Sequence, residues 1–437
     1  MIFEEADLVI KDCKILPMNN AGIIPKGVIA VKGGKISYVG DSGNAQCIRA
    51  EKVLEGHRKV AMPGLVNCHT HLAMTLFRGL AEDMTMDQWL EETIWPLEAK
   101  LRPEDVYIGS LLGCLEMIKN GVTCFADMYF FESKVAEAVK KAGIRASLAS
   151  GIIETVDWQT GDKSFDDAVY FAQKYEGWAE GRITTRLGPH TAYTCTEETL
   201  GKIREKASQA GIGIHIHLSE LGTTPPYIAR KSNLSEVELL ENQGFLDDDV
   251  LAAHCIHLTT KDITILAKRG VKVAYNPVSN MKLAQGVSRV KELIDAGITV
   301  GLGTDGAASN NSLDMFETMK IAALLQKLHY RDPTILRARE VLRAATIKGA
   351  EALGLHNKIG TLEVGKRADI ILVDLNRPNL VPLHDIYANL VYSARGCDVD
   401  SVIVDGKILM ENREVKTLNE EEVIKKAENQ ALGLAGS

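Results

Sequence analysis

The sequence predicts an α/β protein: a (β/α)8 TIM barrel over residues 61–360, with a small β-sandwich built from both chain ends. Two patterns lead to this prediction. In the middle of the chain, short apolar segments alternate with longer helical ones, which is typical of βα units on a parallel sheet. The two ends instead alternate apolar and polar residues and are interrupted by glycine, as in half-buried strands.

The two chain ends resemble each other locally. VKGGKISYVG near the N-terminus and IVDGKILMENR near the C-terminus both place a G-K-I step after a valine. We therefore expect residues 1–60 and 361–415 to form the two halves of one composite β-sandwich, with the barrel inserted between them. The last segment, LNEEEVIKKAENQALGL, has an amphipathic pattern and predicts a C-terminal helix within 416–437.

The middle region supplies enough strands and helices for a complete barrel. The expected strands are GLVNCHTH, GVTCFADM, IRASLASGI, ITTRLGPH, IGIHIHLSE, DVLAAHCIH, VKVAYNPVS and ITVGLGTDG. The expected helices between them include EDVYIGSLLGCLEMIKN, TEETLGKIREKASQA and DITILAKRG. Barrels of this class carry their chemistry at the C-terminal ends of the strands, so side chains at those ends are the first candidates for a site.

Composition excludes several classes of function. The chain has 437 residues, 46% of them hydrophobic and 25% charged, which is the balance of a soluble globular protein. Its net charge of −8 argues against nucleic acid as a partner, although a nucleoside remains acceptable. The sequence contains neither a signal peptide pattern nor an apolar run long enough for a membrane span. The eight cysteines include no C-x-x-C pair, so we expect free thiols and a cytoplasmic protein.

Histidines gather where the predicted strands end. The chain has only 11 histidines. Five of them end strand candidates: His69, His71, His190, His217 and His254. Asp305 follows the eighth strand, ITVGLGTDG, in the same kind of position. This distribution predicts a polar site at the mouth of the barrel.

Four of these side chains form a candidate metal site. His69 and His71 are two residues apart on a strand and so share a face, whereas an isolated H-x-H would be an ordinary polar pair. His217 is favoured over His215 because it lies nearer the strand end, which leaves His215 a supporting or packing residue. Asp305 follows an apolar strand, where an unpaired carboxylate is costly, although an aspartate in a turn is the alternative. Three nitrogens and one oxygen suit Zn²⁺, and also Fe²⁺ or Mn²⁺.

Such a metal activates water, because it can lower the pKa of the water to about 7. Glu220 follows His217 at a short spacing and could carry a proton to a substrate nitrogen. Its alternative is an acidic residue at a helix N-terminus. The sequence lacks the H-x-E and P-C-x-x-C motifs of the zinc deaminases that bind their metal through histidine and cysteine. That class of deaminase is therefore excluded.

The motifs PGLVNCHTH, HIHLSE, GTDGAASNN and IGTLEVGKRADIILVDL, together with His254, resemble the amidohydrolase superfamily over nearly the whole chain. DQWLEETIWPLEAKL and RLGPHTAYTCTEETL extend the resemblance to the 5'-methylthioadenosine/S-adenosylhomocysteine deaminases. Binuclear relatives usually bridge their metals with a lysine from the fourth strand. RLGPHTAY contains none, so the resemblance implies a single divalent metal per subunit.

The resemblance implies a role for each candidate residue. His69, His71, His217 and Asp305 would hold the metal, Glu220 would move a proton at the purine N1, and His254 would orient or deprotonate the attacking water. Asp305 would take the proton of that water. Trp89 would line the nucleoside pocket, Glu98 would bind ribose hydroxyls, and His190 would contact the sugar or its 5' substituent. Taken without the resemblance, Trp89 would be a core residue and Glu98 a surface residue. The product would be an inosine analogue and ammonia, and a dimer or tetramer is expected.

One position departs from the family pattern. Relatives that bind the amino-acid tail of S-adenosylhomocysteine tend to show R-x-x-x-x-R-G after the third strand. Here the segment is RASLASG, with Arg145 present but Ser150 in the second position. A bidentate clamp for a carboxylate is therefore missing there. Lys163, or an arginine from a neighbouring subunit, could replace it. Otherwise, uncharged nucleosides such as 5'-methylthioadenosine, 5'-deoxyadenosine or adenosine should be favoured.

Two other functions compete with this interpretation. A deaminase or dechlorinase of the same superfamily, acting on guanine, cytosine, a pterin or a triazine, would have the same metal site. Trp89, Glu98 and His190 favour a ribose-bearing substrate instead. A non-catalytic scaffold would have lost metal ligands, and this chain retains the full set.

Overall fold

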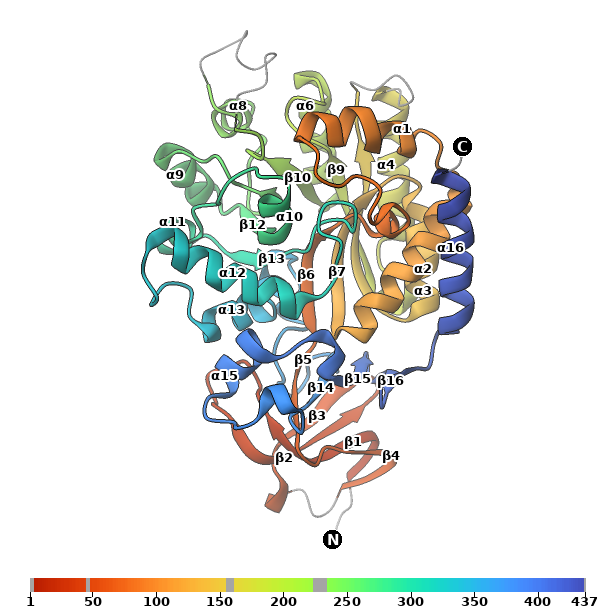
Figure 1. Ribbon diagram of the computed structural model, residues 1–437, viewed down its shortest axis with the longest axis vertical. Coiled ribbons are helices and arrows are strands. Elements are labelled where there is room, and N and C mark those ends of the chain that lie inside the picture. Colours follow the sequence, from red (N-terminus) through yellow and green to blue (C-terminus); the bar gives the residue numbers. More distant parts are fainter. Residues whose placement is uncertain (1–3, 45–47, 155–160, 223–233, 436–437) are drawn as a thin grey trace.

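The computed structural model describes residues 4–44, 48–154, 161–222 and 234–435, without the side chains of 4, 44 and 161–163. Its larger part is the predicted barrel (Figure 1). Eight strands form one sheet in the order β13-β12-β11-β10-β9-β8-β7-β6, with every neighbouring pair parallel. The strands are β6 Leu65–Thr70, β7 Val122–Tyr129, β8 Arg145–Ile152, β9 Ile183–Pro189, β10 Gly213–Leu218, β11 Val250–His254, β12 Lys272–Tyr275 and β13 Val300–Leu302.

The first and last strands meet beside the candidate site. The Asp305 N–H donates to the His69 carbonyl at 2.9 Å, and the Thr304 N–H donates to Asn67 Oδ1 at 3.0 Å. The sheet is thus closed into a barrel by the segment that carries Asp305.

Helices cover the outside of the barrel, as the apolar faces of the predicted segments require. They are α2 Pro103–Lys119, α3 Glu132–Ala142, α4 Gly161–Tyr175, α6 Glu197–Ala210, α8 Glu236–Asn242, α9 Thr260–Arg269, α11 Val290–Asp295 and α12 Met315–Tyr330. Shorter helices are α1 Trp95–Glu98, α5 Trp178–Gly181, α10 Pro277–Lys282, α13 Ala338–Ala344, α14 Ile347–Ala352 and α15 Ile386–Ala388. The C-terminal helix α16, Glu420–Ala435, lies against α2 (Figure 1). Each helix of the described part is too short or too polar to cross a membrane.

The end of the barrel away from the site is closed by α14. Ala350 and Ala352 pack with Val66, Cys68 and Ala126 in an apolar cluster at the beginnings of the strands. The sequence analysis did not anticipate this helix. Its packing leaves the opposite end, where the strands finish, open for substrate.

The two chain ends form a second, mixed sheet, as predicted (Figure 1). Its strands are β1 Glu4–Ile15, β2 Ile24–Lys32, β3 Lys35–Asp41, β4 Ile48–Glu55, β5 Lys59–Pro63, β14 Ile370–Asp374, β15 Val399–Val404, β16 Lys407–Glu411 and β17 Glu414–Val415. The two ends meet at β5, which pairs parallel to β1 and antiparallel to β14. Side chains from both ends, including Ile10, Ile29, Ile370 and Ile403, share an apolar cluster separate from the barrel core. The exact domain limits proposed above stay predictions.

A buried ion pair joins the barrel to this sheet. Arg145 opens β8 and is 2% exposed. Its Nε donates to Asp369 Oδ2 at 2.8 Å, and its Nη2 donates to Asp369 Oδ1 at 3.0 Å and to Asp405 Oδ1 at 2.7 Å. The two carboxylates lie on the C-terminal half of the sheet. Asp405 also lies 3.5 Å from Arg367 Nε, so removal of Arg145 would leave the buried carboxylate of Asp369 without its cationic partner.

We expect Arg145→Ala to lower the free energy of unfolding by about 3–5 kcal/mol, because it leaves the buried carboxylate of Asp369 without its cationic partner. Urea unfolding followed by circular dichroism measures the change. The matched control is Lys426→Ala, which removes a pair with Glu422 whose side chains are 55% and 53% exposed. That control should leave the free energy of unfolding nearly unchanged, because an exposed pair contributes little. Equal losses in the two variants would contradict a structural role for the buried pair.

Candidate active site

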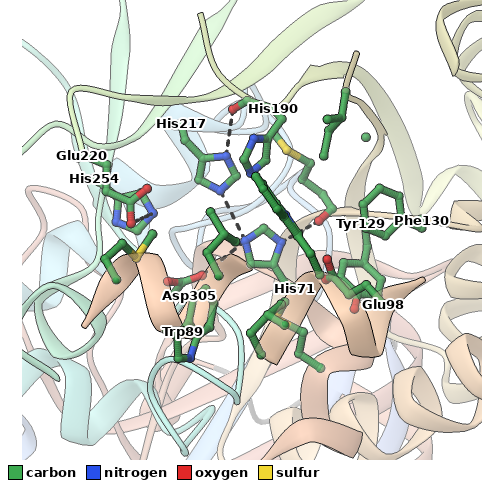
Figure 2. Close-up of a pocket in the computed structure, with 18 of the residues that line it drawn as sticks. His71, Trp89, Glu98, Tyr129, Phe130, His190, His217, Glu220, His254 and Asp305 are labelled. Carbon is green, nitrogen blue, oxygen red and sulfur yellow. Dashed lines mark hydrogen bonds and ion pairs between the residues drawn. The ribbon is translucent and has the colours of Figure 1, made fainter. Parts of the chain in front are cut away.

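The strand ends bring the predicted metal ligands together. His69 lies in β6 and His71 follows that strand directly, while His217 lies in β10. Asp305 comes shortly after β13. Figure 2 shows His71, His217 and Asp305 facing one another in one pocket. The ring nitrogens of His69, His71 and His217 lie within 4.8 Å of one another.

The hydrogen bonds of two histidines determine which nitrogen faces the centre. His71 Nδ1 donates to the Met128 carbonyl at 2.6 Å, and His217 Nδ1 donates to the His190 carbonyl at 2.9 Å. A carbonyl oxygen only accepts, so the neutral rings leave Nε2 unprotonated. These two Nε2 atoms lie 3.3 Å apart, so their lone pairs face and repel each other. A cation between them would remove the repulsion.

Asp305 completes the donor set. Its Oδ1 lies 3.4 Å from the Nε2 atoms of both His69 and His71, and His69 Nε2 has no hydrogen-bond partner among the described residues. Three imidazole nitrogens and one carboxylate oxygen are the donor set expected for a divalent metal with an open position for water. The residues present therefore fit a divalent metal.

The position of Asp305 is held by several hydrogen bonds. The hydroxyls of Ser279 and Ser309 donate to Oδ2 at 2.6 and 2.8 Å, and the Gly306 N–H donates to Oδ1 at 2.7 Å. Burial opposes ionisation, yet His69 and the other nearby histidines hold the pKa of Asp305 well below its usual range. Gly303 lets this segment lie close to both neighbours, because a Cβ there would be 2.2 Å from Asn276 Oδ1 and 3.0 Å from His69 Cβ in β6.

Glu220 and His254 lie on one side of this centre (Figure 2). His254 Nδ1 pairs with Asn280 Oδ1 at 2.9 Å, so Nε2 is directed to the pocket, 3.8 Å from Glu220 Oε1. Burial raises the pKa of the Glu220 carboxyl, which favours a protonated side chain. His254 and Asp305 have φ angles of +69° and +64°. Strained backbone at two residues that lie close together in space is a common feature of functional sites.

The opposite side of the pocket holds Glu98, Tyr129 and Phe130 (Figure 2). Glu98 ends α1 and is buried, so its interpretation as a surface residue is wrong. Burial raises its pKa to about 8, and the neighbouring Tyr129 hydroxyl opposes that shift. Trp89 lies in η3, Gln88–Ile94, where it is both buried and part of the pocket lining. Its indole N–H has no acceptor among the described residues and can donate a hydrogen bond to a ligand.

His190 also lines the pocket, one residue beyond β9. Its Nδ1 pairs with Thr194 Oγ1 at 3.1 Å, and its carbonyl accepts the hydrogen bond from His217. Burial, followed by the charges of the neighbouring histidines, lowers the pKa of His190 to about 3. The ring is therefore neutral over the physiological range.

Several supporting residues were missed by the sequence analysis. Ser279 and Asn280 lie in the segment NPVSN after β12, which was recognised only as a strand end. Asp127 near the end of β7 accepts the Leu72 N–H at 2.7 Å, and so fixes the chain just after His71. Burial raises the pKa of Asp127 to about 8. Polar residues inside or directly after apolar strands were the available signal.

Ser150 lies near the end of β8, in a hollow that also contains Glu98, Phe130 and Gly151. Lys174 is the only basic side chain lining this hollow within the described part of the chain. The side chain of Lys163 lies outside the described residues. Arg145 belongs to the domain junction rather than to this hollow.

Comparisons with known proteins agree with this geometry. The model of the amidohydrolase family matches residues 60–409. A 5'-deoxyadenosine deaminase of Methanosarcina acetivorans is 48% identical over 98% of both chains. A 5-methylthioadenosine/S-adenosylhomocysteine deaminase of Moorella thermoacetica is 50% identical over 95% of this chain and 97% of that one. The crystal structure of an adenosine deaminase from Xanthomonas campestris with bound zinc superposes with a TM-score of 0.96 at 33% identity, covering both chains completely.

The raised pKa of Glu98 predicts a pH-dependent stability. Between about pH 4.5 and pH 8 the unfolded state ionises Glu98 while the folded state keeps the proton, so stability falls as pH rises. Glu98→Gln removes this penalty. We expect it to unfold at nearly the parent temperature at pH 5 and to be more stable at pH 8, by roughly 3–5 kcal/mol.

Thermal unfolding at the two pH values measures this difference. Glu205→Gln, on the outer face of α6, is the control and should show no pH-dependent gain. A Glu98→Gln variant whose difference from the parent is the same at pH 5 and pH 8 would show that Glu98 ionises normally in the fold.

Proposed function

Because the chain belongs to the amidohydrolase family, we propose that it deaminates 5'-modified adenosines by hydrolysis, releasing ammonia and an inosine analogue. It is a hydrolase of C–N bonds in cyclic amidines. The substrates we propose are 5'-methylthioadenosine, 5'-deoxyadenosine, S-adenosylhomocysteine and adenosine. The relatives named for these nucleosides match nearly the whole chain.

One observation carries the proposal. The same pocket is lined by His71, His217 and Asp305, by the buried carboxyl of Glu220, and by Trp89 and Glu98 on its walls. A metal site, a proton carrier and an apolar wall with a buried carboxyl are what hydrolysis of a flat, ribose-bearing base requires.

We propose His69, His71, His217 and Asp305 as the ligands of one divalent metal, and zinc as its identity. The donor set supports zinc, and the solved adenosine deaminase with 33% identity has zinc bound. When bound, the metal supplies Lewis acidity that brings the pKa of a water molecule to about 7.

The side chains of the pocket divide the remaining work. Burial raises the pKa of Glu220, which favours the protonated form, and Glu220 donates a proton to the purine N1. Protonated N1 makes C6 accessible to water. His254, held by Asn280 at Nδ1, directs Nε2 at the attacking water. The two serine hydroxyls donate to Oδ2 of Asp305 and the Gly306 N–H donates to Oδ1. This carboxylate, held at both oxygens, would take the water proton and return it to the leaving ammonia.

Recognition of the nucleoside is assigned to the other walls. Trp89 packs on the purine and Glu98 binds the ribose hydroxyls, while His190 contacts the sugar or its 5' substituent. These residues favour a nucleoside over guanine, cytosine, pterin or triazine substrates. The homo-oligomer expected from the sequence stays a prediction.

Glu220→Gln is expected to lower kcat by about 10²–10⁴, because an amide cannot deliver the proton to N1. Ammonia release from 5'-deoxyadenosine measures the rate, and metal analysis checks that the variant keeps its metal. Glu205→Gln serves as the surface control and should match the parent. Near-normal turnover of a metal-loaded Glu220→Gln enzyme would refute the assignment.

An ammonia-release panel tests the function itself. It compares 5'-methylthioadenosine, S-adenosylhomocysteine, 5'-deoxyadenosine, adenosine, guanine and cytosine by kcat/KM. We expect the 5'-modified adenosines to exceed both free bases by at least about 10²-fold, because the ribose contacts are lost with a base. A free base as the best substrate would overturn the proposal.

A further inference from the structure

Three histidines are proposed as metal ligands. The hydrogen-bond partner of His69 is a side chain, whereas the partners of the other two are backbone carbonyls. His71 and His217 donate their Nδ1 protons to the carbonyls of Met128 and His190. A backbone carbonyl has no hydrogen to give, so the fold itself determines those two tautomers. His69 has no such carbonyl: its Nδ1 lies 2.9 Å from Nε2 of His215, a side chain that can either accept or donate.

We propose that His215 is a positioning residue that accepts the Nδ1 proton of His69 and thereby holds His69 in the metal-binding tautomer. This inference rests on the proposed assignment of His69 as a ligand. His69 can offer a lone pair at Nε2 only when its proton is on Nδ1. Because the two rings share one hydrogen, His215 must then carry its own proton on Nδ1.

The two tautomers are coupled, and the alternative arrangement is incompatible with metal binding. If His215 donated from Nε2, the proton of His69 would move to Nε2, the atom that faces Asp305 Oδ1 at 3.4 Å. That proton would occupy the position of the metal. The tautomer of His215 therefore decides whether the third nitrogen of the metal site is available.

The surroundings of His215 hold the ring in place for this contact. His215 is fully buried in β10, and its ring meets that of His69 edge to face, with centroids 5.0 Å apart. Below it, Arg186 Nη1 donates to the carbonyls of Ile214 and Asp249 at 3.3 and 3.0 Å, which joins β9, β10 and the start of β11. Nδ1 of His215 has no partner among the described residues. The buried ring of His215 therefore makes its polar contact through Nε2, with His69.

Metal affinity tests the proposal without reference to any substrate. Apoprotein is titrated with Zn²⁺ in competition with a chromophoric chelator. His215→Leu fills the space but cannot accept a hydrogen bond, and should bind Zn²⁺ about 10- to 100-fold more weakly than the parent. His215→Gln offers Oε1 in place of Nε2 and should restore most of the affinity. His329→Leu, at an exposed position of α12, controls for the loss of an imidazole and should match the parent.

The outcomes separate this inference from the proposed function. His69→Ala reports the metal site itself: if the parent binds Zn²⁺ no better than this variant, the proposed metal site is wrong and the inference falls with it. If the parent binds well and His215→Leu binds equally well, only the role of His215 is refuted. A glutamine variant as weak as the leucine variant would also refute it, because hydrogen-bond acceptance would not be the property that matters.

A spectroscopic measurement keeps the proposal testable if His215→Leu does not fold. Long-range ¹⁵N–¹H correlation spectra of the zinc-loaded parent distinguish the two tautomers of a neutral imidazole. We expect the His215 proton on Nδ1 and an unprotonated, acceptor-type Nε2. A His215 proton on Nε2 would overturn the proposal.

Discussion

Two imidazole nitrogens, each with a lone pair, face one another 3.3 Å apart at the mouth of the barrel, and much of the surrounding fold serves to hold them there. Left alone they repel, so a cation is needed to make the arrangement favourable. Their orientation comes from the backbone, since the carbonyls of Met128 and His190 accept the hydrogens on the far side of each ring. Those carbonyls lie at the ends of β7 and β9. The parallel sheet therefore sets the chemistry of the site as well as its position.

Burial shifts the pKa of the carboxyls in the pocket in ways that depend on their neighbours. Burial raises the pKa of both Glu98 and Glu220, whereas the histidines beside Asp305 keep that carboxyl ionised. Carboxyls with different environments in one pocket can divide acid and base roles between them. The strained φ angles of His254 and Asp305 belong to the same pattern. These strained residues cost folding free energy. The large apolar core of the barrel and the buried ion pair of Arg145 stabilise the fold and offset that cost.

The reaction and the substrate depend on different parts of the chain. The proposed metal ligands lie at strand ends, which carry the chemistry in barrels of this class. The residues proposed to recognise the nucleoside come from η3 and α1, which lie between β6 and α2, and from the segments after β7 and β9. These segments are distinct from the strand ends that carry the proposed metal ligands. Ser150 lies near the end of β8 and lines the hollow that also contains Glu98.

The sequence by itself determined the architecture and the metal-site candidates, because strand periodicity and the rarity of histidine are local signals. All eight barrel strands, the paired chain ends and the convergence of His69, His71, His217 and Asp305 follow from them. It could not determine the burial of Glu98, the helix α14 under the barrel, or the serines that hold Asp305. Nor could it distinguish His215 from a packing residue. Those features depend on which side chains meet across elements distant in sequence, and only the tertiary structure decides hydrogen-bond partners and local dielectric.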